Sequence, residues 1–199
     1  AALARLVATL VDPFVNQVIS IVGSSISVAT EQSPLMMGLV LGGLMKMICT
    51  SPLSSMALTA MLGLTGLPMG IAAVACFGGS FTNGMVFKRL KLGDNGRVLA
   101  VMLEPLTQAD IITKNPLPIY ASNFFGGAIS GIAAALLGIV NNAPGTASPI
   151  PGLLAPFAFN DPMKVVLAMA IAAVGGTVAG FVGSTVFKKL GFGNDVVPN

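Results

Sequence analysis

Three long stretches of this chain contain no Asp, Glu, Lys or Arg: residues 47–87, 115–160 and 165–187. Each is longer than the roughly 20 residues that an α-helix needs to cross the hydrocarbon core of a bilayer. Only 9% of the 199 residues are charged and 54% are hydrophobic, whereas about a quarter of the residues in a soluble globular domain are charged. The sequence therefore predicts an all-α polytopic membrane protein.

Residue types that are missing or rare exclude several functions. The 10 Lys and Arg residues are spread thinly along the chain against 7 Asp and Glu, so we expect no nucleic-acid partner. The chain has no His, no Gly-x-Ser-x-Gly, no Walker lysine and no metal-ligand cluster. We therefore expect no catalytic residues, no cofactor and no metal site. Cys49 and Cys76 lie in apolar runs and are interpreted as packing residues.

An internal repeat organises the sequence. Residues 71–74 recur at 171–174, and residues 86–90 recur at 186–190 with one Arg-to-Lys change, both displaced by 100 residues. Each copy is expected to hold an apolar helix, a break rich in Pro, Gly and Ser, and a second apolar helix with a basic tail. The chain then divides into a lead segment at 1–32, a first membrane repeat at 33–97, a re-entrant segment at 98–120 and a second membrane repeat at 121–199.

The helices expected in the two repeats span 34–49, 67–87, 121–140 and 162–187. Asp161 before Pro162 supplies an N-cap and a Pro at the first helical position, which marks the start of the last helix. Gly-x-x-x-Gly spacings occur at 38/42, 66/70, 127/131 and 176/180. Such spacings let helix backbones approach closely, either inside one bundle or at a dimer face.

Basic residues indicate how the repeats are oriented. Lys and Arg cluster after each repeat, at 88–97 and 188–189, so the positive-inside rule predicts that both tails are cytoplasmic and that the repeats are parallel. Arg5 and Lys46 fit this scheme less well. The lead segment 1–32 is expected to be an amphipathic interfacial helix or a membrane crossing, and to belong to a truncated chain because it begins without Met.

Two stretches break the helical pattern without becoming polar: residues 50–55 and the Pro-rich residues 141–161. Non-helical backbone at membrane depth is tolerated only where protein buries it or where it lines a watery cavity. Broken segments in matching halves therefore point to a transport site. The alternative is that 141–161 forms an external loop, although it carries several Leu and Phe residues that an exposed loop seldom presents.

Two carboxylates lie beside prolines in the segment 98–120. Glu104 is a candidate ligand-binding residue, because a carboxylate at membrane depth is expensive unless it faces a bundle interior or a cavity. An ionised carboxylate accepts hydrogen bonds from two adjacent hydroxyls of a sugar or polyol, and amide side chains can donate and accept beside it. The candidate substrate-binding residues are Glu104, Gln108, Asp110, Asn141, Asn142, Pro144, Gly145 and Ser148. The alternative places Glu104 and Asp110 on a hydrated cytoplasmic loop, paired with Lys114.

These motifs resemble the membrane subunit, enzyme IIC, of bacterial sugar phosphotransferase systems. Leu103-Glu104-Pro105-Leu106 stands where the fructose and mannitol branch carries Ile-Thr-Glu-Gly, and Ala143-Pro144-Gly145 stands where that branch has Ala-Pro-His-Gly. The sequence of residues 141–152 is more similar to a divergent subgroup of toxin regulators related to a perfringolysin regulator. The resemblance begins at about residue 33 and covers most of the chain.

The resemblance implies that Glu104 binds sugar hydroxyls and that Asn142, Pro144 and Gly145 shape the pocket. It also implies phosphorylation by separate cytoplasmic IIB and IIA subunits, with IIB docking near the basic tails, and a homodimer in the lipid bilayer. One departure stands out, because the histidine of the family is missing and Gly145 lies near its place.

We therefore expect a multi-pass protein of the bacterial inner membrane that binds and translocates a sugar or polyol. Two alternatives stay open at the level of sequence. One is a membrane sensor of the same fold that does not transport, and the other is an ion-coupled transporter that uses Glu104 or Asp110 as a proton relay.

Overall fold

The computed structural model describes residues 12–13, 16–17, 20–21, 24 and 33–193. The expectation of an all-helical chain is confirmed for these residues, among which there is no strand. The elements from residue 33 onward are α2 (Pro34–Thr50), α3 (Ser55–Met61), α4 (Gly66–Leu90), α5 (Asn95–Leu103), η1 (Pro105–Gln108), α6 (Ala109–Lys114), α7 (Pro116–Leu136), α8 (Pro149–Leu154), η2 (Ala155–Ala158) and α9 (Pro162–Lys189). Most of the expected lead segment lies outside the described residues.

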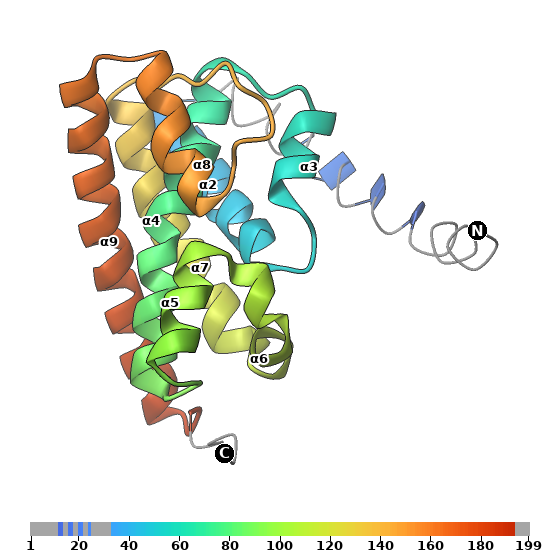
Figure 1. Cartoon of the computed structure of the whole chain (residues 1–199), viewed down its shortest axis with the longest axis vertical. Helices are drawn as coiled ribbons and strands as arrows, with labels where there is room; N and C mark the ends of the chain where they lie inside the picture. The colour runs from blue at the N-terminus through green and yellow to red at the C-terminus, as the bar shows by residue number, and fades with distance from the viewer. Residues whose placement is uncertain (1–11, 14–15, 18–19, 22–23, 25–32, 194–199) are drawn as a thin grey trace.

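Among the described residues, three helices are long and apolar enough to cross a membrane: α4, α7 and α9. They lie side by side along the long dimension of the bundle (Figure 1). At a rise of 1.5 Å per residue, the 25 residues of α4 span about 37 Å. The second apolar group is shorter and consists of α2 and the stretch from α8 to η2.

Helix boundaries follow local signals in the sequence. The carboxylate of Asp161 accepts hydrogen bonds from the backbone N–H groups of Met163 and Lys164, so α9 begins where its N-cap predicts. Helix α7 begins earlier than expected, at Pro116, because proline is well tolerated at the first helical position. The same helix ends before Gly138, whose φ of 61° terminates it short of the expected residue 140.

Helix crossings use the Gly-x-x-x-Gly pairs inside the bundle. In α2 and α7, Gly38 lies against the backbone of Gly131 and Gly42 lies against Gly127, so these two helices run antiparallel. In α4 and α9, a side chain at Gly176 would meet the carbonyl of Gly78, while Gly180 lies against Thr82. These two helices therefore run parallel.

The second pairing agrees with the 100-residue displacement, which matches α4 with α9 in the same direction. The antiparallel crossing of α2 and α7 means that the first helices of the expected repeats run in opposite directions. The organisation of the chain as two repeats therefore stays a prediction, to which the parallel α4 and α9 alone conform.

Several segments reverse near the middle of the bundle (Figure 1). Helix α2 enters from one end, and the chain turns back through α3 after Thr50. Helix α5 enters from the opposite end, and the chain turns back through η1 and α6. The 17 residues of α2 and the 9 residues of α5 give lengths of about 25 and 13 Å, which together match the length of α4. Both helices pack on α4, so their C-terminal ends meet at a similar depth.

A compact apolar cluster holds the hairpin formed by α5, η1 and α6. Its fully or almost fully buried members are Val86, Phe87, Leu90, Leu92, Val101, Ile111, Ile112 and Ile119. They come from the end of α4, from α5 and α6, and from the start of α7. Packing against two long helices thus fixes the base of the hairpin, while its tip, at the end of α5, reaches toward the middle of the bundle.

Candidate functional site

The tip of the α5 hairpin carries Glu104. Its backbone is extended, with φ −148° and ψ 97°, because the following Pro105 disfavours the helical conformation of the residue before it. The backbone N–H of Glu104 donates to Ala100, and its carbonyl accepts from the backbone N–H and hydroxyl of Thr107. This local network fixes the backbone and leaves the carboxylate as the free end of the tip.

Ser148 brings the Pro-rich break to this carboxylate. Its hydroxyl donates to Oε2 of Glu104 at 3.5 Å, although 44 residues separate them in the sequence. Ser148 is the N-cap residue of α8 and is buried. The hydroxyl of Ser55, at the start of α3, donates to the neighbouring carbonyl of Ala147 at 2.6 Å. The turn after α2, the tip of the α5 hairpin and the Pro-rich break therefore meet around Glu104 and Ser148.

Asn141 and Asn142 hold the break in place. Asn141 is fully buried, accepts from the N–H of Ala143 and donates to the hydroxyl of Thr146. The carboxamide oxygen of Asn142 accepts from the N–H of Gly66 and so caps the start of α4. No hydrogen bond between either residue and Glu104 is present in the described part of the chain. Asn141 therefore holds the turn of the break, and Asn142 ties the break to the start of α4.

Pro144 and Gly145 form the turn that directs the break toward the bundle. Pro144 is exposed, and Gly145 has a φ of 82°, a conformation that a residue with a side chain rarely adopts. A side chain at Gly145 would contact Met56 and Ala60 of α3. The turn therefore lies against α3 and shapes the path of the break that leads to Ser148.

Gln108 and Asp110 are brought together with Arg97. The guanidinium of Arg97 donates to Gln108 at 3.4 Å and forms an ion pair with Asp110 at 3.0 Å. The hydrogen bond from Arg97 lowers the pKa of Asp110 below its ordinary value of 3.8. Asp110 is exposed, whereas Gln108 is buried on η1 and also contacts Thr107. Asp110 therefore pairs with Arg97, and not with Lys114 as the sequence alternative proposed.

A buried polar layer lies between α2, α4 and α7. Asn123 donates to Asn83 at 2.6 Å, and Asn83 donates to Thr50 at 3.4 Å. Lys46, one turn before Thr50, is completely buried. One feature of the sequence points to this layer: Lys46 is a lone cation between apolar residues, and it fitted the expected topology poorly. The pairing of the two asparagines depends on tertiary packing and has no such signal.

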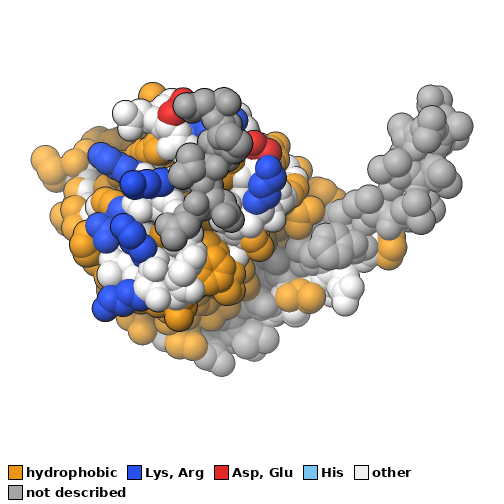
Figure 2. All heavy atoms as spheres, turned by 90° about the horizontal axis from the view of Figure 1, so that it is seen from below, with side chains coloured by type: hydrophobic (Ala, Val, Ile, Leu, Met, Phe, Trp, Pro, Cys, Tyr) orange, Lys and Arg blue, Asp and Glu red, His pale blue; other side chains and the backbone are white. Residues whose placement is uncertain are grey.

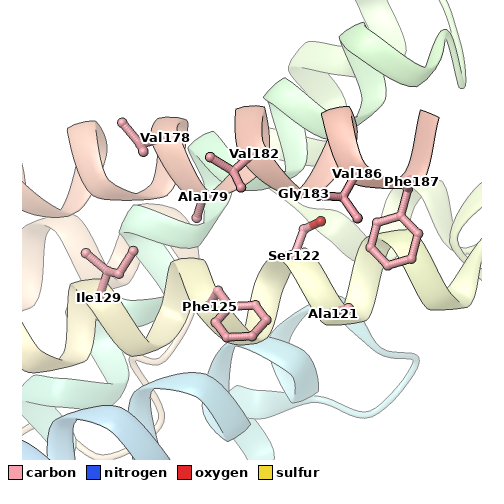
Figure 3. A pocket seen from close by; sticks show the side chains of 10 residues that line it. All are labelled: Ala121, Ser122, Phe125, Ile129, Val178, Ala179, Val182, Gly183, Val186 and Phe187. Atoms are coloured by element: carbon pink, nitrogen blue, oxygen red, sulfur yellow. The ribbon is translucent and has the colours of Figure 1, made fainter. Parts of the chain in front are cut away.

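A separate apolar groove of about 420 Å³ lies between α7 and α9 (Figure 3). Phe125 and Ile129 of α7 line it together with Val178 and Val182 of α9. It contains none of the sequence-predicted site residues, and its hydrocarbon walls offer little to the hydroxyls of a sugar. We therefore place the candidate site at Glu104 and not in this groove.

Cations gather at one end of the bundle (Figure 2). Lys88 and Lys188 lie in the last turns of α4 and α9 and are exposed, as is the adjacent Lys189. Arg89 is engaged internally: its guanidinium donates to Ser184 and Thr185 and lies 4.0 Å from the centre of the Phe181 ring. The exposed lysines are thus free to meet a partner, while Arg89 joins α4 to α9.

Comparison with protein families agrees with this architecture. The model of the family described as "Phosphotransferase system, EIIC" matches residues 1–196. A search of curated proteins and a search of solved structures found no match. The family match covers nearly the whole chain, and the three long apolar helices are those of a membrane protein. The chain therefore belongs to the EIIC family, the sugar-permease membrane component of the phosphotransferase system.

Proposed function

We propose that this chain binds a sugar or polyol at the tip of the α5 hairpin and presents it for phosphorylation by a cytoplasmic IIB subunit. The observation that carries the proposal is the contact between Glu104 and Ser148, where segments entering from opposite ends of the bundle meet. A carboxylate there accepts hydrogen bonds from vicinal hydroxyls, and the buried serine hydroxyl adds a polar contact. Broken segments that meet at mid-depth are typical of alternating-access transporters.

The test is thermal unfolding of the purified protein with a panel of sugars and polyols. A ligand that binds only the native state raises its stability, so one compound or a closely related set is expected to raise the unfolding temperature saturably. Glu104→Gln should abolish the shift. Asp110→Asn tests the other candidate carboxylate. Because Asp110 is exposed and paired with Arg97, we expect this variant to respond to the ligand as the wild type does.

The proposal is wrong if Glu104→Gln responds to the ligand like the wild type, or if no compound stabilises the wild type. Uptake of the stabilising compound into vesicles then separates transport from sensing, since a sensor binds its ligand without moving it. Requirement for phosphorylated IIB separates the phosphotransferase mechanism from ion coupling. The pairing of Asp110 with Arg97 removes one carboxylate from the relay that ion coupling would use.

The basic end of the bundle is the proposed docking face for IIB. Lys88, Lys188 and Lys189 are exposed there, close to the base of the α5 hairpin. The positive-inside rule predicts that this end is cytoplasmic. Neutralising the three lysines should weaken IIB binding and make the remaining interaction less sensitive to salt. Unchanged binding would move the docking face elsewhere.

Three finer assignments are part of the proposal. The motifs around Glu104 and Pro144 support the fructose and mannitol branch, while residues 141–152 support the toxin-regulator subgroup. The bacterial inner membrane is the proposed location. A homodimer is proposed from the family resemblance, and the mass of the protein in detergent or nanodiscs tests it directly.

A further inference from the structure

Lys46 lies in a channel made by two glycines. Its aliphatic stem passes across Gly79 of α4, and a side chain added at Gly79 would collide with three of its carbon atoms. A side chain at Gly127 of α7 would collide with its Cβ. The absence of side chains at these two positions creates the space that the lysine occupies between three helices.

The ammonium group at the end of this stem has no hydrogen-bond partner in the described part of the chain. The carboxamide oxygen of Asn123, one helical turn from Gly127, is also without a donor there. A buried cation without a counter-charge is strongly unfavourable in the apolar interior of a membrane protein, and such residues usually pair with an opposite charge. The position of Lys46 therefore calls for a nearby anion.

Glu104 is the acidic residue best placed to supply that charge. The other described acidic residues are engaged or distant: Asp94 caps α5, Asp110 pairs with Arg97, Asp161 caps α9, and Asp12 is exposed on the lead segment. Glu104 precedes η1, which contacts α2.

We propose that Lys46 is the charge partner of Glu104: the tip of the α5 hairpin closes on the end of α2, and the ammonium then orients the carboxylate toward sugar hydroxyls. This inference rests on the proposed sugar site. Lys46 is a positioning residue that acts through Glu104. The 3.5 Å contact with Ser148 is the hydrogen bond that the carboxylate makes in the described state, and it is long enough to exchange for a stronger partner.

A double-mutant cycle tests the pair in the full chain. The variants are Lys46→Met, Glu104→Gln and the double variant, and unfolding temperature is measured without ligand. Glu104→Gln removes the proposed counter-charge of the buried Lys46 ammonium and should lower the unfolding temperature. The same change should lower it less when residue 46 is Met, because no buried cation then remains. Strictly additive losses would overturn the pair.

Ligand binding supplies the readout that a purely structural lysine would not move. Lys46→Met should weaken sugar binding about tenfold or more, as expected when a charged hydrogen-bond partner is disturbed. Lys46→Arg keeps the charge and should recover most of the affinity. Lys114→Met, an exposed lysine on α6, is the control and should bind like the wild type. Unchanged affinity in Lys46→Met would overturn the proposal.

The two proposals fail in different ways. If no sugar stabilises the wild type but the cycle is non-additive, the sugar site is wrong and the charge pair stands. If sugar binds and Glu104→Gln abolishes the effect while Lys46→Met does not, the site stands and the pair is wrong. If Lys46→Met does not fold, recovery of folded protein in the double variant supports the pair, and its failure refutes the pair.

Discussion

The crossing of α2 and α7 makes a quantitative prediction for Gly42→Ala. An ideal Cβ at Gly42 lies 2.5 Å from the carbonyl oxygen of Gly127 and 2.9 Å from the Cα of Gly131. Since non-bonded heavy atoms prefer separations near 3.5 Å, the helices must part by about 1 Å. Overpacking of this kind costs about 1–3 kcal/mol, and the better helix propensity of alanine returns up to about 1 kcal/mol. We expect a net loss of about 1–2 kcal/mol.

The adjacent change Gly43→Ala is the matched control on the same helix. Its Cβ meets the ring edge of Phe124 at 2.6 Å, and this ring is a partly exposed side chain that can turn away. We expect its stability to lie within about 1 kcal/mol of the wild type, because propensity offsets a small side-chain shift. Unfolding by SDS in mixed micelles measures both free energies. A Gly42→Ala variant as stable as Gly43→Ala would refute the close antiparallel crossing.

Three further predictions concern the site and its support. Ser148→Ala should weaken sugar binding less than Glu104→Gln does, since it removes one neutral hydroxyl and leaves the carboxylate; binding curves for the two variants check the order. The lowered pKa of Asp110 means that its pairing with Arg97 stabilises the fold above the ordinary value of 3.8 and that this contribution fades as the pH falls through the lower folded value. The unfolding temperature of Asp110→Asn should therefore be lower than that of the wild type at pH 7, and the two should converge in acid. The difference should be small because the pair is exposed, and thermal unfolding across pH measures it. Asn160→Ala should lower stability by about 2–3 kcal/mol, measured by SDS unfolding, because the side chain makes three hydrogen bonds that tie the break together.

The sequence was most informative where a local rule governs the structure. Uncharged length predicted the apolar helices α4, α7 and α9, and Asp161 with Pro162 predicted the start of α9. The start of α7 was predicted at residue 121 and lies at Pro116, because Pro116 could not be distinguished from a loop residue without knowing where α6 ends. The direction of α2 relative to α7 could not be predicted from the Gly-x-x-x-Gly spacing, because this spacing is the same in parallel and antiparallel helix pairs.

The candidate site was partly predictable for a similar reason. Glu104 was predicted as a site residue because a carboxylate at membrane depth is costly, and the structure brings it to Ser148. The Asn141 side chain forms a local turn with Ala143, whereas the role of Asn142 depends on a contact with Gly66, 76 residues away. No sequence spacing encodes the second contact. The position of Lys46 between Gly79 and Gly127 could not be predicted either, because three helices must assemble to create it.

The meeting of α2 and α5 near the middle of the bundle also has an electrostatic consequence. Both helices present their C-terminal ends there, and the last carbonyls of a helix carry a partial negative charge equivalent to about half an electron. Two such ends and the Glu104 carboxylate carry more negative charge than the Lys46 ammonium offsets, so they favour groups that donate hydrogen bonds and repel anions. We expect this potential to accept a neutral sugar through its hydroxyls and to expel the same sugar once it carries a phosphate, which would give the release step a direction.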